Sequence, residues 1–252
     1  MFRTYEHPNF ENLSALIESE STDKAKRNSL KHYKSMLTKD GVARVDHDSD
    51  GFGRYISSIK KGSKRTKTTG ATFSKDIRAA LFGGKYDDLD IVNASGTIMY
   101  QLFIKMDHEV PCMEKYCTKR ERVLTEIMDH YDPPLDRETA KSMVIEVFFG
   151  GDGRSSLNND FGLPRRGKHG LPEFLEELKE EYRVSITEVM DICEDDDEHP
   201  YHNLYSWANH KSMKNGKSLW YGSFASYLYQ DVERSVLNVI ISEINEIAKE
   251  KH

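Results

Sequence analysis

The stretch DRETAKSMVIEVFFGG carries cations that are spaced for phosphate binding. Arg137 and Lys141 lie four residues apart, which on a helix places them about 40° apart on one face. Like charges at this spacing repel unless an anion lies between or above them. A polyphosphate fits, because arginine forks onto phosphate oxygens and lysine acts as a mobile point charge. Phe149 and Gly150 follow two turns later, where the ring could cover a flat group. The alternative is an ordinary amphipathic helix with surface cations and a buried phenylalanine.

Asp90 lies in the stretch YDDLDIVNASG, at the end of a short apolar run that is typical of a buried strand. A carboxylate at a strand end, beside a free backbone carbonyl, is a good ligand for Mg²⁺. The alternative is that Asp90 caps the helix that follows. Asp87 and Asp88 are expected to be exposed at the start of the strand.

The stretch DSDGFGR holds Asp50, then Gly53 and Arg54. A glycine before an arginine lets the backbone approach a partner while the guanidinium forks onto a phosphate or a carboxylate. A hairpin turn with an exposed arginine is the competing interpretation. Residues 54–75 carry seven cations and no acid, among them Lys64, Arg65 and Lys67. This segment fits contact with a nucleic-acid backbone, and its rival interpretation is a solvated loop.

Composition narrows the class of protein. The chain has 252 residues and a net charge of −6, so any nucleic-acid site must come from local patches. Three cysteines argue against a disulfide framework and for a reducing compartment. No segment approaches the ~18 apolar residues of a membrane span, and the first residues lack a signal-peptide core. We therefore expect an intracellular protein, in the cytoplasm or at a viral replication site, with no membrane partner.

The elements that would position these residues can be read from periodicity and caps. Residues 9–38 predict a polar helix, and the run at residues 38–58 predicts strand, turn, strand. Asp136 is a plausible N-cap for the helix that carries Arg137. Further helices are expected at residues 75–82, ended by Gly83, at 113–131 and at 222–250. Separate helices are expected at 171–184 and 185–193, the second with Ser185 and Glu188 as a capping box. Loops are expected at 151–170 and, with acidic composition, at 194–203.

Taken in order, Asp-x-x-Gly-Arg, the strand-end aspartate and Arg-x₃-Lys-x₇-Phe-Gly resemble the motifs of family A DNA polymerases and single-subunit phage-type RNA polymerases. The details resemble the transposon–virus polymerases of virophages and transposons, which tend to show Asp-Ile-x-Asn-Ala where this chain has DIVNA. The resemblance runs from about residue 44 to the end. It implies an α+β fold, with a small antiparallel palm sheet and mostly helical fingers. The implied division is an N-terminal helical region (1–43), the first part of the palm (44–107), fingers (108–215) and a palm helix (216–252).

The resemblance also implies roles for single residues. Asp90 would hold two catalytic Mg²⁺ ions, with the carbonyl of Ile91 as a further ligand. Arg137 and Lys141 would grip the incoming nucleoside triphosphate, and Phe149 would stack at the insertion site, followed by Gly150. The motif residues Asp50, Gly53 and Arg54 would touch the backbone of the template or primer. The implied partners are template and primer, nucleoside triphosphates, and a helicase domain or other segment of a longer protein.

Three departures from the family pattern qualify this expectation. Phe149 lacks the tyrosine hydroxyl that senses the ribose 2′-OH, and Ile145 replaces the usual phenylalanine. The His-Asp pair expected beyond the long helix, whose aspartate is the second shared metal ligand, is missing, and HDSDG at residues 47–51 precedes the other motifs. Because Asp90 alone holds two ions poorly, we expect this chain to bind nucleotide weakly and polymerise poorly, as an incomplete polymerase or primase domain.

Alternatives from other classes remain open. One is a catalytically inactive nucleic-acid-binding or assembly module that keeps the polymerase scaffold. Another is a zinc protein, because Cys193, His199, His202 and His210 are suitable ligand types, although their spacing matches no standard site. Cys112 and Cys117 are expected to be ordinary buried thiols.

Overall fold

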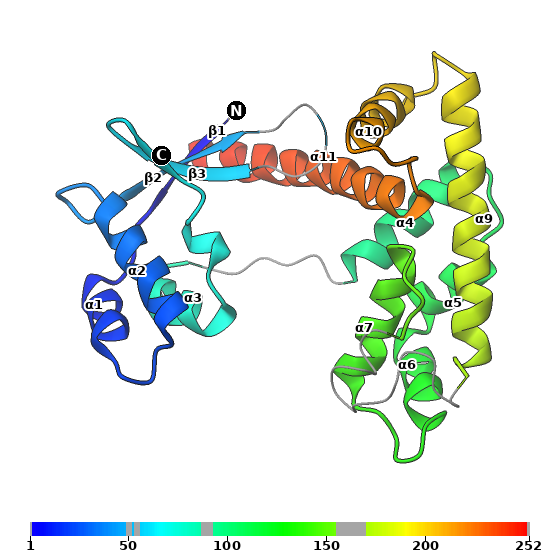
Figure 1. Cartoon of the computed structure of the whole chain (residues 1–252), viewed down its shortest axis with the longest axis horizontal. Helices are drawn as coiled ribbons and strands as arrows, with labels where there is room; N and C mark the ends of the chain where they lie inside the picture. Colours follow the sequence, from blue (N-terminus) through cyan, green and yellow to red (C-terminus); the bar gives the residue numbers. More distant parts are fainter. Residues whose placement is uncertain (1, 49–51, 53–55, 87–92, 155–169, 251–252) are drawn as a thin grey trace. The chain divides into compact units, whose positions relative to one another are not determined.

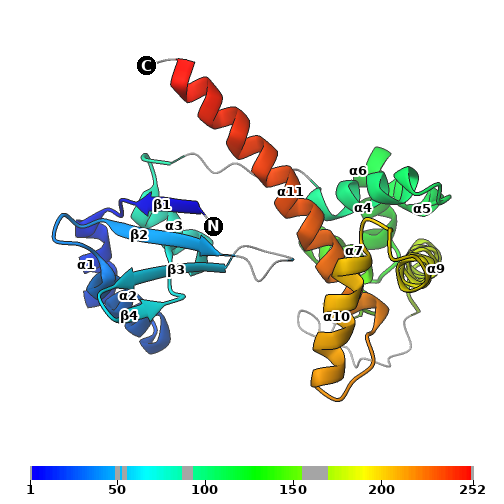
Figure 2. The same ribbon diagram turned by 90° about the horizontal axis from the view of Figure 1, so that it is seen from above.

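The computed structural model describes residues 2–48, 52, 56–86, 93–154 and 170–250 (Figures 1 and 2). The chain divides into two compact units, Met1–Asp90 and Ile91–His252. The first contains an antiparallel sheet and helices, and the described part of the second is helical. The expected α+β class is confirmed. No helix in the described ranges is long and apolar enough to cross a membrane.

The sheet of the first unit has the strand order β1-β2-β3-β4, formed by β1 (Phe2–Glu6), β2 (Ala43–Asp48), β3 (Ile56–Lys61) and β4 (Lys64–Thr66). Strands β2 and β3 are the predicted strand–turn–strand, and Val45 faces Ile59 in their register with both side chains fully buried. Strand β1 was not predicted. It lies within the region expected to be helical, and its hydrogen-bond partner, β2, is some forty residues away along the chain (Tyr5 opposite Arg44).

Helices α1 (Phe10–Glu18), α2 (Lys24–Met36) and α3 (Lys75–Phe82) lie on one side of this sheet (Figure 1). Their buried residues form one core with the sheet, including Leu13, Leu30, Tyr33, Val45, Ile59 and Leu81. The single helix predicted over residues 9–38 is wrong, because the chain breaks after Glu18 and restarts at Asp23, whose side chain accepts the N–H of Lys26 at 2.8 Å. The helix at 75–82 is confirmed, with the Gly83 N–H bonding to the carbonyl of Ala79.

Glu6, at the end of β1, joins the sheet to the short helix η1 (Gly70–Thr72). Its carboxylate accepts the Gly70 N–H at 3.0 Å and the Tyr33 hydroxyl at 2.8 Å. Burial raises the pKa of this carboxyl, although the hydrogen bonds from Gly70 and Tyr33 act in the opposite direction. The folded chain therefore holds this proton more tightly than the unfolded chain does.

This pKa shift predicts a pH dependence of stability. The wild-type protein should lose stability relative to Glu6→Gln as the pH rises from the unfolded pKa of 4.5 through the raised folded value, because glutamine stays uncharged. The free energy of unfolding, measured with urea between pH 4 and pH 8, would show the difference. Glu11→Gln, at an exposed site in α1, controls for loss of one charge. A wild-type-to-variant difference that does not change with pH would contradict the prediction.

The second unit comprises α4 (Ala94–Lys105), α5 (Pro111–Thr118), α6 (Arg120–Asp129), α7 (Arg137–Phe148), α9 (Glu173–Asp195), α10 (His202–Lys214) and α11 (Tyr221–Glu250). Helix α9 contacts α5, α7, α10 and α11 and forms the spine of this unit. Its Tyr182 ring packs against Phe103 and Phe148, each at 5.6 Å between ring centroids. Phe148 also packs against Tyr116 at 5.6 Å. These aromatic residues fix α7 in place.

Three local predictions for this unit need correction. Helix α9 is continuous where separate helices were expected, because no glycine or proline interrupts it at Ser185, which is buried in mid-helix and caps nothing. The acidic stretch 194–203 is only partly a loop, since Asp195 ends α9 and His202 begins α10. The helical stretch at 113–131 is divided at Lys119 into α5 and α6. The long C-terminal helix is confirmed as α11.

Candidate functional site

Helix α7 begins where its capping residue predicts. The Asp136 side chain accepts the Thr139 N–H at 2.9 Å and the Thr139 hydroxyl at 2.8 Å, which confirms the predicted N-cap. The helix buries one face, formed by Ala140, Met143, Val144, Val147 and Phe148. Arg137 and Lys141 lie at the edge of this buried face, with side chains 43% and 34% exposed. The amphipathic pattern therefore places both predicted phosphate-binding cations together at one accessible face.

Each of these cations has a carboxylate beside it. Glu138 lies between them, 3.3 Å from Arg137 Nη1 and 3.4 Å from Lys141 Nζ. Glu121 of α6 accepts hydrogen bonds from Arg137 Nη2 at 2.6 Å and Nε at 2.9 Å. The Arg137 guanidinium lowers the pKa of Glu121, and Glu121 in turn raises the pKa of Arg137. The anion that the paired cations require is thus supplied here by protein carboxylates.

These ion pairs are on the surface, where water and salt weaken them. The side chains of Glu121 and Glu138 are 67% and 72% exposed. Exposed ion pairs contribute only ~0–1 kcal/mol. A ligand with several phosphate oxygens could therefore displace both carboxylates, because it brings more negative charge to the same donors.

The C-terminal end of α7 is fixed against the start of α11. Gly150 has φ +78, and a side-chain carbon there would lie 2.7 Å from Gly222 Cα and 3.0 Å from the Trp220 ring. The Tyr221 hydroxyl donates to the Gly150 carbonyl at 3.4 Å. The half-buried Phe149 packs edge-on against Tyr229 of α11, at 5.6 Å between centroids. Phe149 and Gly150 thus form a helix junction, about 12 Å along the axis from Lys141.

Several predicted site residues lie outside the described part of the chain: Asp50, Gly53, Arg54, Asp90 and Ile91. Their proposed roles remain predictions. Asp87 and Asp88, which were expected to be exposed, also lie outside the described part. Lys64, Arg65 and Lys67 belong to the first unit, on or just after β4, and all are exposed. Arg65 donates to the Ser58 hydroxyl at 3.1 Å and lies 3.6 Å from the Asp48 carboxylate.

Neither the carboxylates of this site nor the partners of Phe149 are predicted by the sequence. Glu138 had a local signal, because it precedes Lys141 by three residues, the spacing of an ion pair on a helix. Glu121 and Tyr229 had none, since they come from other helices.

The residues proposed for zinc do not gather into a site. Cys193 Sγ and His199 Nδ1 share a hydrogen bond of 3.1 Å, while His202 Nδ1 donates to the Cys193 carbonyl at 2.8 Å. Burial raises the pKa of the Cys193 thiol to about 11, which disfavours the thiolate that binds metal. Over the described ranges, no three histidine, cysteine, aspartate or glutamate side chains are grouped to hold a metal ion. Cys112 and Cys117 are free and half-buried.

One comparison with known proteins gives a match. Over 180 residues, or 69% of this chain, the sequence is 28% identical to a Sputnik virophage protein named "Putative helicase V13". The match covers 22% of that protein, so the chain spans about a fifth of its length. No protein-family model and no solved structure matches the chain. The chain therefore has a distant and partial relative in a virophage.

Proposed function

We propose that this chain belongs to a virophage-related replication protein and holds a nucleoside triphosphate for template-directed nucleotidyl transfer, of the polymerase or primase type. The observation that carries the proposal is the pair Arg137 and Lys141 on one partly exposed side of α7, restrained by weak surface carboxylates. The virophage relative named as a helicase supports a role in replication. A helicase domain or other segment of a longer protein is a proposed partner, together with template and primer.

In this proposal each residue has a distinct task. Arg137 forks onto phosphate oxygens and Lys141 neutralises a second phosphate, so the triphosphate is oriented along α7. The Asp90 carboxylate and the Ile91 carbonyl would hold the Mg²⁺ ions. When bound, these ions lower the pKa of an attacking 3′-hydroxyl and shield the leaving pyrophosphate. The cationic segment that includes Lys64, Arg65 and Lys67, with the motif of Asp50, Gly53 and Arg54, would contact the nucleic-acid backbone.

Asp90 is a single carboxylate, and a two-metal site needs a second one. Because the match covers only 22% of the virophage protein, we propose that this carboxylate comes from a further segment of a longer protein. The 252-residue chain should then bind nucleotide weakly and extend a primer poorly. Robust primer extension by this chain would contradict that expectation, unless another acid such as Asp50 supplies the ligand.

The test of this function is the Mg²⁺ dependence of nucleotide binding. Titration with a fluorescent deoxynucleoside triphosphate should show binding that strengthens with Mg²⁺. Asp90→Asn should remove that strengthening, because the amide carries no charge for the ion. Asp87→Asn, a matched change in the same acidic stretch, should leave it intact. Equal Mg²⁺ dependence in both variants would refute the role of Asp90.

A second candidate is a catalytically inactive nucleic-acid-binding or assembly module. The ion pairs favour it. Arg137 joins α7 to Glu121 of α6, and Lys141 pairs with Glu138 within α7, so both cations then serve the fold. In that case the wild-type chain would show no Mg²⁺-dependent binding of nucleotide, although it could still bind nucleic acid.

A further inference from the structure

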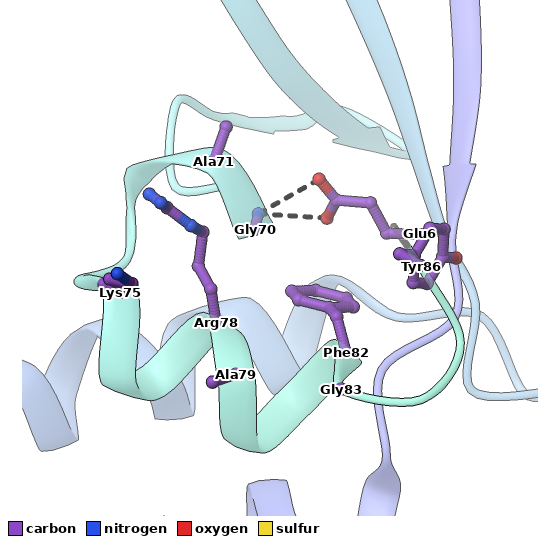
Figure 3. Close-up of a pocket in the computed structure, with 9 residues that line it drawn as sticks. All are labelled: Glu6, Gly70, Ala71, Lys75, Arg78, Ala79, Phe82, Gly83 and Tyr86. Atoms are coloured by element: carbon purple, nitrogen blue, oxygen red, sulfur yellow. Dashed lines mark hydrogen bonds between the residues drawn. The ribbon is translucent and has the colours of Figure 1, made fainter. Parts of the chain in front are cut away.

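The first unit contains a cavity of about 330 Å³ between the end of β1, η1 and α3 (Figure 3). This volume is at the lower end of the roughly 300–1,000 Å³ typical of small-molecule sites. Lys75, Arg78, Ala79 and Phe82 line it from α3. They recur at intervals of three and four residues, so they share the helix face that looks into the cavity.

One end of the cavity offers hydrogen-bond acceptors beside an aromatic ring. The Glu6 carboxylate lies over the Phe82 ring, and its oxygens point toward Gly70 (Figure 3). A side-chain carbon at Gly70 would lie 2.7 Å from Phe82 Cζ and 3.0 Å from Glu6 Oε1, so glycine allows this close arrangement without displacing either side chain. Among the described residues, Oε1 accepts only the Gly70 N–H, at 3.1 Å, so it has room to accept another donor.

The other end of the cavity is cationic. Arg78 extends from α3 toward Ala71 and donates to the Phe73 carbonyl at 3.2 Å (Figure 3). Lys75 lies one turn earlier on the same face. Within the described residues, neither Arg78 nor Lys75 forms an ion pair with a carboxylate. These charges remain available to an anionic ligand.

The walls between the two ends are apolar and aromatic. Ala71, Ala79 and Phe82 line the cavity, and the Tyr86 ring stands edge-on to Phe82 at 5.6 Å between centroids. Tyr86 is held by its hydroxyl, which accepts the His7 N–H at 2.9 Å. A matching ligand has a flat ring for these walls, an N–H donor for Glu6 and an anion for Arg78 and Lys75. A nucleotide combines all three.

The charge of the surrounding segment favours a nucleic-acid strand over a free nucleotide as the ligand of this cavity. Residues 56–86 contain eight lysines and arginines but only one acid, Asp76. Such an excess of positive charge favours a polyanion. A base can enter a pocket of this kind only when it is unstacked and unpaired, as in a single strand.

We propose that the cavity lined by Glu6, Arg78 and Phe82 binds one nucleotide unit of a single-stranded nucleic acid, with the base against Phe82 and its phosphate at Arg78 and Lys75. This inference rests on the proposed function only in taking nucleic acid as the partner. It uses no residue of the α7 face. In this proposal the first unit binds single-stranded nucleic acid.

The experiment fills the cavity without disturbing the core. Ala79 is exposed on α3, so Ala79→Leu should occupy the base position while the helix stays intact. Affinity of the full chain for a fluorescent single-stranded 12-mer should fall at least about fivefold, the lower end of what stacking of one base contributes. Ala15→Leu, the same change at an exposed site of α1, should bind like wild type. Arg78→Gln should lower the slope of log affinity against log salt by about 0.7.

Photo-cross-linking locates the base directly. A 12-mer carrying 5-iodouracil should cross-link to Phe82 or Tyr86, as mapped by mass spectrometry. A free nucleoside monophosphate should compete with the 12-mer for the wild-type chain but not for Ala79→Leu. That result would support nucleotide binding in the cavity and would show that a free nucleotide can also occupy it. The proposal would be overturned if Ala79→Leu left the affinity for the 12-mer unchanged, or if cross-links formed only at other residues. Binding of an apolar peptide without binding of nucleotides would also overturn it.

The outcome is independent of the proposed catalytic site. Triphosphate binding by Asp90→Asn and Arg137→Gln tests the catalytic site, whereas binding of the single-stranded 12-mer by Ala79→Leu tests the cavity. If those two variants do not change triphosphate binding while Ala79→Leu weakens binding of the 12-mer, the proposed nucleotidyl transfer is refuted and the proposed cavity site is retained. If those two variants weaken triphosphate binding while Ala79→Leu leaves binding of the 12-mer unchanged, the transferase proposal is retained and the cavity site is rejected.

Discussion

Gly150→Ala is expected to destabilise the protein by about 2–5 kcal/mol. Part of this is the roughly 1–2 kcal/mol cost of placing a side chain at φ +78. The rest is overpacking, typically ~1–3 kcal/mol, because the new methyl group would lie 2.7 Å from the backbone of Gly222. Neither the end of α7 nor the start of α11 can yield easily, since both are backbone. Urea denaturation followed by circular dichroism gives the change in unfolding free energy.

Gly216→Ala is the matched control. Gly216 also has positive φ, at +69, but a side-chain carbon there meets nothing within 4 Å. Its substitution should cost only the conformational part, about 1–2 kcal/mol. If both variants lose the same stability, the close approach of α7 to α11 at Gly150 is not a tight contact in solution. The junction would then not position Phe149.

Arg137→Gln is expected to weaken binding of a Mg²⁺–triphosphate by roughly tenfold to a hundredfold. Hydrogen bonds to charged groups contribute ~1.5–3 kcal/mol, and glutamine cannot provide the charged fork. The side chain is 43% exposed, so its loss should leave the fold intact. Titration with a fluorescent deoxynucleoside triphosphate, at constant ionic strength, measures the dissociation constant.

Changes to the neighbouring charges sharpen this prediction. Glu138→Gln should strengthen triphosphate binding, because it removes the carboxylate that lies beside both Arg137 and Lys141. Arg122→Gln removes a comparable surface cation of α6, which pairs with Glu126 at 3.0 Å, and should change nothing. Affinity unchanged in Arg137→Gln would show that Arg137 serves only to join α7 to Glu121 of α6, as the inactive-module alternative requires.

The sequence by itself determined the elements whose signals are local. Asp136 was recognisable as an N-cap because a cap bonds to a residue three positions on, and the bond to Thr139 is present. The shared face of Arg137 and Lys141 followed from helix geometry alone. Local signals also misled, since Ser185 and Glu188 have capping-box spacing yet lie within one continuous helix. There the burial of Ser185 against the rest of the unit outweighs the cap.

Only the tertiary structure decided which distant residues meet. Strand β1 exists because residues 2–6 pair with β2, and Arg137 meets Glu121 because α6 packs beside α7. In the cavity proposed to bind nucleic acid, a hydrogen bond joins Glu6 to Gly70. These residues are 64 positions apart, and no sequence periodicity predicts their contact. Caps and helix faces depend on neighbours within a turn or so, whereas pairing, burial and pockets depend on how whole elements pack. For this chain the sequence therefore located the cations of the proposed nucleotide site, and packing determined their carboxylate partners and the second cavity.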